Sequence, residues 1–150
     1  MEVDSKYDHI ANKVIEQETN IGIYINKKRY SLPINKLKTV IHNKGTKTAV
    51  YDNSVYLDKL QDGGWVQIPY KDDLDFYMEV LELKPGEISK QEVTIENLDY
   101  ELTDGEYRIR KSMQVGAEKL PLRTNLKLKI EPMGIKLFQL MRSIAEDDKT

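Results

Sequence analysis

The sequence contains no cysteine, and this one absence excludes three kinds of site. Without thiols the chain has no disulfide, no thiolate zinc site and no cysteine nucleophile. Histidine is scarce, since only His9 and His42 occur, and we expect them to lie in different secondary-structure elements. The sequence also lacks a Gly-x-Ser-x-Gly turn, a phosphate-binding loop and a His-x-x-x-His pair. We therefore expect a protein that is not an enzyme and has no cofactor and no metal.

A dominant sign of charge and long apolar runs are absent as well. The formal net charge is −2 although 32% of the residues are charged, so no strong overall field attracts nucleic acid. No apolar run approaches the length of a membrane span, and the first residues lack the basic and apolar segments of a secretory signal. We expect a soluble domain, extracytoplasmic if a signal or anchor was removed and cytoplasmic otherwise.

Apolar and polar residues alternate along much of the chain, and turn residues separate the alternating segments. A period of two is typical of strands with one buried face, whereas parallel α/β folds place helices between their strands. The sequence therefore predicts one all-β domain, an antiparallel β-sandwich of about seven to nine strands. The expected strands are 21–25, 29–32, 37–41, 49–60, 65–69, 76–80, 88–98, 105–113 and 122–130.

Short turn motifs connect these strands. Asp62-Gly63-Gly64 predicts a tight hairpin that brings the segment from Trp65 back antiparallel to the strand before it. Residues 26–28 join the first two strands, and they fit either a hairpin or a kink in one continuous strand. Pro33 follows, and proline favours the edge of a sheet.

Apolar residues recur at helical spacing near both ends of the chain, which predicts two short amphipathic helices. We expect an N-terminal helix and linker at 1–20, the sandwich at 21–131, and a C-terminal helix with an acidic tail at 132–150. Each helix either covers the sandwich or contacts a partner, and pairing between copies would give a homo-oligomer. The apolar residues are Tyr7, Ile10, Ala11, Val14 and Ile15 in the first helix, and Ile135, Leu137, Phe138, Leu140, Met141 and Ile144 in the second.

The segment from Leu102 to Ile109 carries the most informative pattern, Leu-Thr-Asp-Gly-Glu-Tyr-Arg-Ile. A glycine two residues before a tyrosine, at the start of a strand, is typical of the tyrosine corner of immunoglobulin-like sandwiches. In that corner the tyrosine hydroxyl bonds a main-chain group a few residues upstream. We predict that Leu102, Gly105, Tyr107 and Ile109 form such a corner, with Gly105 allowing unusual backbone angles.

The order of motifs across the middle of the chain resembles bacterial immunoglobulin-like domains of Firmicute lipoproteins and membrane-anchored proteins. The resemblance implies an immunoglobulin-like sandwich that binds a partner outside the cytoplasm. The matching segments are Tyr30-Ser31, Asn43, Tyr56-Leu57-Asp58-Lys59, Asp62-Gly63-Gly64, Trp65 to Pro69, Phe76, Leu83 to Glu87 and Leu102 to Lys111.

Two positions depart from the pattern of antibody-like domains. Ile109 stands where those domains carry a cysteine, so apolar packing replaces the bridge between the sheets. Trp65 follows a hairpin turn, so we expect it at one end or edge of the sandwich. We then expect Val55 or Leu57 to fill the core at the central strand.

Two groups of side chains are candidates for protein recognition. One is a loop with tyrosines beside an acidic cluster, because tyrosine supplies contact area at low entropic cost. The cluster lacks the alternating ligands of a calcium loop, so we expect a solvated turn there. The other group is the apolar face of the expected C-terminal helix. The residues are Tyr70, Asp72, Asp73, Asp75 and Tyr77 in the loop, and Phe138 and Met141 in the helix.

A basic stripe is a further candidate. Arg108, Arg110 and Lys111 would lie beside Lys127 and Lys129 if their strands pair, and phosphate or an acidic protein patch could bind there. Outward positions of a sheet are commonly polar, so the stripe also fits an ordinary solvated surface.

These observations lead to a hypothesis of binding. We expect a non-enzymatic, extracytoplasmic domain that recognises a protein or a component of the cell envelope. The alternatives are an intracellular inhibitor or regulator that acts through a loop or an edge strand, and an assembly subunit that pairs through its terminal helices. We expect a protein partner and no nucleic acid, with membrane contact only through a missing anchor.

Overall fold

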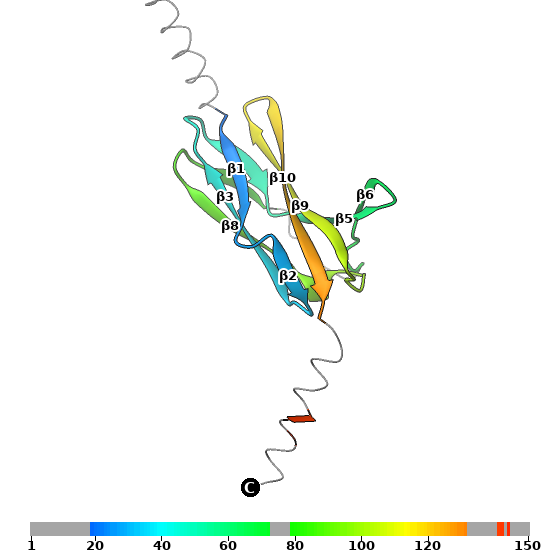
Figure 1. Cartoon of the computed structure of the whole chain (residues 1–150). Helices are drawn as coiled ribbons and strands as arrows, with labels where there is room; N and C mark the ends of the chain where they lie inside the picture. The colour runs from blue at the N-terminus through cyan, green and yellow to red at the C-terminus, as the bar shows by residue number, and fades with distance from the viewer. Residues whose placement is uncertain (1–18, 73–78, 132–140, 143, 145–150) are drawn as a thin grey trace, which may run out of the picture.

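The computed structural model describes residues 19–72, 79–131, 141, 142 and 144, and it consists of two β-sheets that share one interior (Figure 1). The smaller sheet is antiparallel, with the strand order β1-β3-β8. The larger sheet has the order β2-β10-β9-β4-β7, and β5 and β6 branch from β9. The all-β prediction is therefore confirmed, but the described residues form ten strands and not seven to nine, and the pair β2–β10 is parallel and not antiparallel. The strands are β1 (Ile21–Ile25), β2 (Arg29–Leu32), β3 (Lys36–Asn43), β4 (Ala49–Asp52), β5 (Tyr56–Gln61), β6 (Gly64–Gln67), β7 (Val80–Leu83), β8 (Ile88–Thr94), β9 (Gly105–Val115) and β10 (Glu118–Ile130).

The first two strands lie in different sheets. β1 pairs with β3 in the smaller sheet, whereas β2 runs parallel to β10 at the edge of the larger one. The chain thus crosses between the sheets at residues 26–28, so β1 and β2 form neither a hairpin nor one continuous strand. Pro33 ends β2 at this edge, where no further strand needs its missing N–H.

Several predicted strands differ in extent from those observed. The segment 49–60 is two strands, because the chain turns at 53–55 so that β4 pairs with β7 and β5 pairs with β9. The strand expected from residue 88 ends at Thr94, and a 3₁₀ turn at Ile95–Asn97 follows it. The strand expected at 76–80 falls mostly at 73–78, outside the described residues, and β7 begins only at Val80.

The predicted terminal helices lie almost wholly outside the described residues. The N-terminal helix, with His9, falls within 1–18, and most of the C-terminal one falls within 132–150. Met141, Arg142 and Ile144 are described there; they have helical backbone and are exposed. The helices, the three-region division and their role in assembly stay predictions.

The turn between β5 and β6 is the tight hairpin that the sequence predicts. Gln61 pairs with Gly64, and the two residues between them, Asp62 and Gly63, have φ angles of 51° and 80°. Positive φ at both positions is the backbone of a type I′ turn, which aspartate and glycine tolerate well. This tight hairpin carries Trp65 at the edge of the larger sheet.

Alternation along β9 divides the larger sheet into an inner and an outer face. The odd-numbered residues from Tyr107 to Val115 are buried, whereas the even-numbered ones are at least partly exposed. The interior contains two apolar clusters, one around Leu37, Leu57 and Tyr107 and one around Ile41 and Met113. Val55 and Leu57 are both buried, as expected of the residues that take the core role.

Tyr107 is fully buried and is fixed by two hydrogen bonds to one residue. Its hydroxyl donates to the Thr103 carbonyl at 2.7 Å and accepts from the Thr103 N–H at 3.2 Å. Gly105 has a φ of 157°, and a β-carbon there would lie 3.1 Å from Lys59 Cε. The tyrosine-corner geometry therefore joins the connection after the 3₁₀ turn to the start of β9, while Ile109, with no exposed surface, packs in the core.

Lys111 faces the interior, so its assignment to the basic stripe was wrong. Its side chain has no exposed surface, and its Nζ donates to the carbonyl oxygens of Asp52 and Ser54. Burial lowers the pKa of Lys111, and the charge of Asp52, whose Oδ1 lies 3.6 Å away, opposes that shift. Lys111 thereby ties β9 to the break between β4 and β5.

Candidate interaction face on the larger sheet

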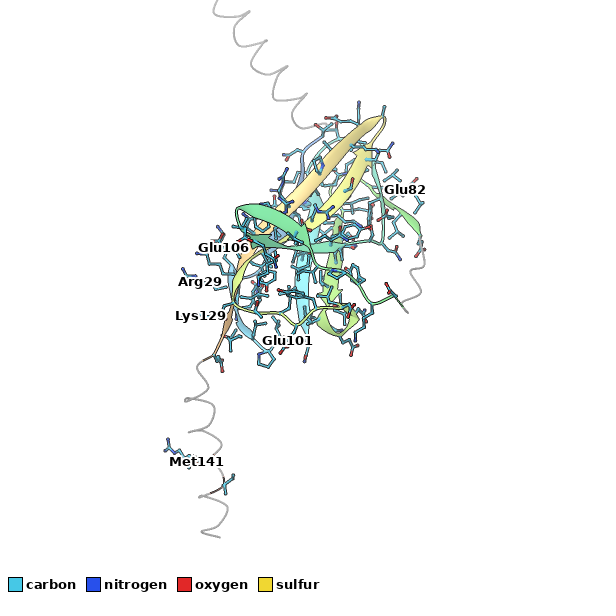
Figure 2. The ribbon with its side chains drawn as sticks, turned by 90° about the vertical axis from the view of Figure 1, so that its right-hand side faces the viewer. Arg29, Glu82, Glu101, Glu106, Lys129 and Met141 are labelled. Atoms are coloured by element: carbon cyan, nitrogen blue, oxygen red, sulfur yellow. The ribbon has the colours of Figure 1, made fainter. Side chains whose placement is uncertain are left out.

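Cationic side chains gather on the outer face of the larger sheet. Every outward position of β10 from Lys119 to Lys129 is cationic or uncharged, although the whole chain has a net charge of −2. Figure 2 shows Arg29, Glu106 and Lys129 projecting from the same side of the sandwich. We call this surface the cationic face. Its cationic residues are Lys28, Arg29, Arg108, Arg110, Lys119, Arg123, Lys127 and Lys129, and its acidic residues are Asp58 and Glu106.

Asp58 anchors the centre of this face although its strand position points outward. Its Oδ2 accepts hydrogen bonds from Arg108 Nε at 2.8 Å and from Arg110 Nε at 3.0 Å. The guanidinium groups stack on aromatic rings, Arg108 on Trp65 at 4.6 Å and Arg110 on Tyr56 at 4.9 Å. This cover leaves only 3% of the Asp58 side chain exposed. The arginines are thus held in fixed positions, and so is the indole of Trp65.

The ionisation of Asp58 follows from these contacts. Burial alone would raise the pKa of Asp58, but the hydrogen bonds and charges of Arg110 and Arg108 outweigh it and lower the pKa. A carboxylate with a lowered pKa in the folded protein stabilises the fold above its unfolded pKa of about 3.9. That contribution is lost as the pH falls through the folded value.

We therefore expect the wild type to be more stable than the Asp58→Asn variant by an amount that depends on pH. The difference in the free energy of unfolding should be constant above about pH 5 and should shrink below about pH 4, because only the wild type has this carboxylate to protonate. Urea unfolding of both proteins at a series of pH values measures it. A difference that stays constant down to pH 2, or grows, would contradict the lowered pKa.

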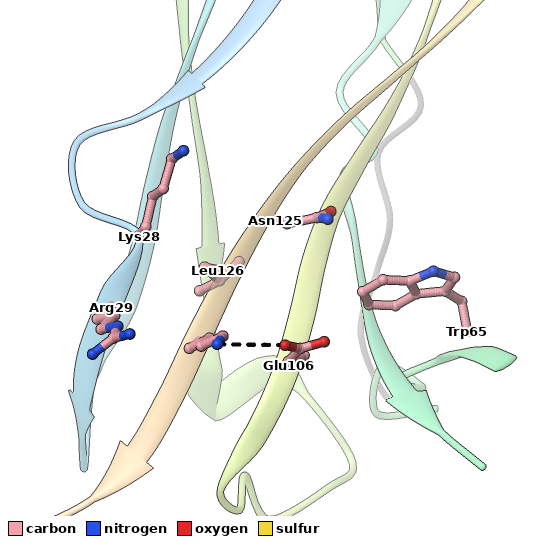
Figure 3. Close-up of a pocket in the computed structure, with 7 residues that line it drawn as sticks. Lys28, Arg29, Trp65, Glu106, Asn125 and Leu126 are labelled. Atoms are coloured by element: carbon pink, nitrogen blue, oxygen red, sulfur yellow. Dashed lines mark ion pairs between the residues drawn. The ribbon is translucent and has the colours of Figure 1, made fainter. Parts of the chain in front are cut away.

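An open hollow lies on the cationic face between β2 and β6 (Figure 3). Its volume is about 360 Å³. Trp65 stands on one side and Lys28 and Arg29 stand on the other, with Asn125 and Glu106 between them. The remaining lining residues are Leu126 and Lys127.

The charges in this hollow do not cancel. Lys127 Nζ lies 3.5 Å from Glu106 Oε1, and both side chains are about half exposed. The structure gives the side chains of Lys28 and Arg29 no ion pair with any described residue. The hollow therefore combines one aromatic wall, one polar amide and two cations that are open to an acidic ligand.

The structure brings the predicted basic stripe together, but with acidic partners. β9 and β10 pair antiparallel, so Arg108 lies opposite Asn125 and Lys127 opposite Glu106. Asp58 pairs with both arginines and Glu106 contacts Lys127, so these three cations are not open to a phosphate. Lys129 has no ion pair with any described residue. The unneutralised charge of the hollow is instead at β2, a position that the sequence analysis did not select.

The other predicted recognition residues have different outcomes. Tyr70 is partly buried, because its hydroxyl donates to the Val55 carbonyl and its ring packs edge-on against Tyr56. It is therefore less exposed than the sequence analysis expected, and its role in recognition stays a prediction. Burial raises the pKa of Tyr70 to about 12. Asp72 and Met141 are exposed, the latter at 61%. Asp73, Asp75, Tyr77 and Phe138 lie outside the described residues.

Sequence reasoning missed Asp58 and Trp65 as parts of one surface. A signal for Asp58 was present, because Asp58 follows Tyr56 at the same spacing that separates Arg110 from Arg108. Residues two apart share one face of a strand, so the two pairs match once β5 and β9 are neighbours. That neighbourhood joins segments about 50 residues apart, and the turn motifs do not reveal it.

Within residues 19–72, 79–131 and the three described C-terminal positions, no group of three histidine, aspartate or glutamate side chains could hold a metal ion. No helix in that same part of the chain has the length and apolar character that crossing a bilayer requires.

Comparisons with solved structures give distant similarities. A chaperone–tip adhesion subunit complex of Csu pili from Acinetobacter baumannii has 15% identity and a TM-score of 0.46, covering 74% of this chain and 51% of that one. The periplasmic chaperone SfaE has 8% identity and a TM-score of 0.47, covering 74% and 59%. The E. coli chaperone DraB has 11% identity and a TM-score of 0.47, covering 77% and 56%. The chain thus spans less than two thirds of each of these proteins.

Two comparisons of the sequence itself give different results. A search of curated proteins finds no match. The family model described as a bacterial Ig-like domain matches residues 17–128, which include every strand from β1 to β9 and most of β10. With this match and the two-sheet sandwich that it covers, the chain belongs to the bacterial immunoglobulin-like domain family.

Proposed function

We propose that this domain is a non-enzymatic binding module that recognises a protein of the bacterial cell envelope through the cationic face. The observation that carries the proposal is the fixed layer of Trp65, Arg108, Asp58, Arg110 and Tyr56 beside the open hollow. Tryptophan and arginine are the residues that most often dominate binding energy at protein interfaces. Because their positions are set before binding, little side-chain entropy is lost on association.

The rigid sheet beneath this layer also supports a binding role. β9 pairs with β10 along eleven registered positions and with β5 along four, so the outward side chains stand on continuous main-chain ladders. The place at the cell envelope comes from the family resemblance and from nothing in the geometry.

Capture from a cell-envelope extract by the immobilised domain tests the proposal. We expect Trp65→Ala to abolish capture of any specific partner and Arg123→Glu to weaken it, because both residues lie on the cationic face. The matched control is Tyr24→Ala on the smaller sheet, where Tyr24 is 45% exposed. Equal capture by all four proteins, or loss only with Tyr24→Ala, would contradict the assignment of the face. Thermal unfolding of each variant shows whether it is folded.

A further inference from the structure

We infer that the hollow on the cationic face binds an acidic peptide segment, with its carboxylates at Lys28 and Arg29 and an apolar side chain against Trp65. The inference rests on the proposed function, since it names the chemistry of the partner at the same surface. Four features of the hollow lead to it: its length, its sign of charge, the position of Glu106 and the amide of Asn125.

The first feature is the distance that a ligand must cover. Lys28 and Arg29 are at β2, and Trp65 is on β6, which lies beyond β10, β9 and β5 in the sheet. Four strand spacings of about 4.8 Å correspond to roughly 19 Å. A single phosphate or carboxylate cannot reach both ends, whereas about six residues of extended peptide can, at about 3.3 Å each.

The second feature is the sign of the charge at the β2 end. Lys28 and Arg29 have no acidic partner among the described residues, so a ligand can neutralise them without breaking an existing pair. The planar guanidinium of Arg29 suits a carboxylate, which it can bind through two parallel hydrogen bonds. These cations select an anionic group at one end of the ligand.

The third feature separates a peptide from a polyanion. Glu106 lies in the middle of the hollow and is 51% exposed at its side chain. A phosphate polymer carries charge at every repeat and would place one of them against this carboxylate. A peptide can carry its charges at the β2 end alone and cross Glu106 and Lys127 with uncharged residues.

The fourth feature is the exposed amide of Asn125 at the centre of the hollow (Figure 3). An asparagine side chain offers both a donor and an acceptor, which matches the N–H and C=O of a peptide group. The indole of Trp65 then provides an apolar surface for a leucine or phenylalanine at the far end of the ligand. The four features together describe a mixed segment, acidic at one end and apolar at the other.

The chain contains a single tryptophan, so the fluorescence of Trp65 reports directly on this hollow. We propose to titrate the full chain with a synthetic peptide that has glutamates at one end and leucines at the other. The comparison probes are the same peptide with lysines in place of glutamates, and inorganic polyphosphate. We expect a saturable change with the glutamate peptide alone, and weaker binding at higher salt.

Charge reversal at the β2 end gives the decisive comparison. The double substitution Lys28→Glu and Arg29→Glu should lower the affinity for the glutamate peptide by about tenfold or more, because two exposed attractions become repulsions. The matched control reverses Lys38 and Lys90 on the smaller sheet, and it should leave the affinity unchanged. Both pairs are exposed surface residues, so folding should survive, and the unfolding temperature checks this.

Each other outcome overturns the inference. No saturable binding of the glutamate peptide, or equal affinity after reversal at Lys28 and Arg29, would show that the hollow does not select acidic peptides. Binding of polyphosphate without the peptide would assign the hollow to a phosphate polymer. If envelope capture still requires Trp65 in those cases, the proposed function stands and only the ligand class is wrong. If capture does not require Trp65, the proposed function itself fails.

Discussion

Replacing Asp58 with alanine is expected to lower the free energy of unfolding by about 3 kcal/mol, although Asp58 occupies an outward position of its strand. Its carboxylate is almost completely covered and accepts hydrogen bonds from both Arg108 and Arg110. Removal would leave two guanidinium groups close together without their counter-charge. The cost lies at the lower end of the range for buried pairs, because the Arg110 side chain is 35% exposed and can recover some hydration.

A second carboxylate on the same face supplies the control for this prediction. Glu106 also pairs with a cation, but Glu106 and Lys127 are both about half exposed. Exposed pairs contribute little, so Glu106→Ala should change the free energy of unfolding by at most about 0.5 kcal/mol. Urea unfolding at neutral pH measures both variants. If Asp58→Ala lowers the free energy of unfolding as little as Glu106→Ala does, then Asp58 is solvated and the stacked arginines do not depend on it.

The same substitution connects stability with binding. Trp65 stacks on Arg108, and Arg108 is positioned by Asp58. Loss of Asp58 should therefore release the indole of Trp65 as well as the guanidinium of Arg108. We expect it to weaken the binding of any ligand in the hollow, although Asp58 does not line the hollow. A variant that unfolds more easily but binds the glutamate peptide as tightly as the wild type would separate the two roles.

Local patterns predicted most of the strands because each depends on neighbouring residues alone. Alternation indicated the strands at 21–25, 37–41 and 105–113, and Asp62-Gly63 indicated a two-residue hairpin. Alternation also carries the information that would have placed Lys111 inside, because Lys111 follows the outward Arg110 directly and stands two residues after the inward Ile109. The charge of lysine suggested the surface, but two main-chain carbonyls satisfy it inside.

Features that depend on distant segments could not be predicted in this way. The break after β4 is different, because the polar run Asp52-Asn53-Ser54 is a local turn signal that the single expected strand at 49–60 passed over. The sequence suggested a surface position for Tyr70 beside an acidic loop, but its hydroxyl donates to the carbonyl of Val55 and its ring packs edge-on against Tyr56. The hollow combines residues from β2, β6, β9 and β10, which only the strand order brings together.

Tyr107 is the other position where we expect a large loss of stability, and two substitutions separate its ring from its hydroxyl. Tyr107→Ala should lower the free energy of unfolding by about 4 kcal/mol, because a fully buried ring leaves a cavity in the larger apolar cluster. Tyr107→Phe keeps the ring and loses the hydroxyl with its bonds to Thr103, so it should cost about 1–2 kcal/mol. Urea unfolding of both variants gives the two values.

The ratio of these two losses decides what the corner does. A Phe variant as stable as the wild type would mean that Tyr107 acts through packing alone, and that water replaces its bonds to Thr103. A Phe variant as unstable as the Ala variant would mean that the two hydrogen bonds hold the whole connection in place. Tyr24 is exposed on the smaller sheet, so Tyr24→Phe should change the free energy of unfolding by less than about 0.5 kcal/mol. This variant is the control for removing a tyrosine hydroxyl from a solvated position. The intermediate loss that we expect requires both contributions, since the ring fills the core while the hydroxyl fixes the chain segment that enters β9.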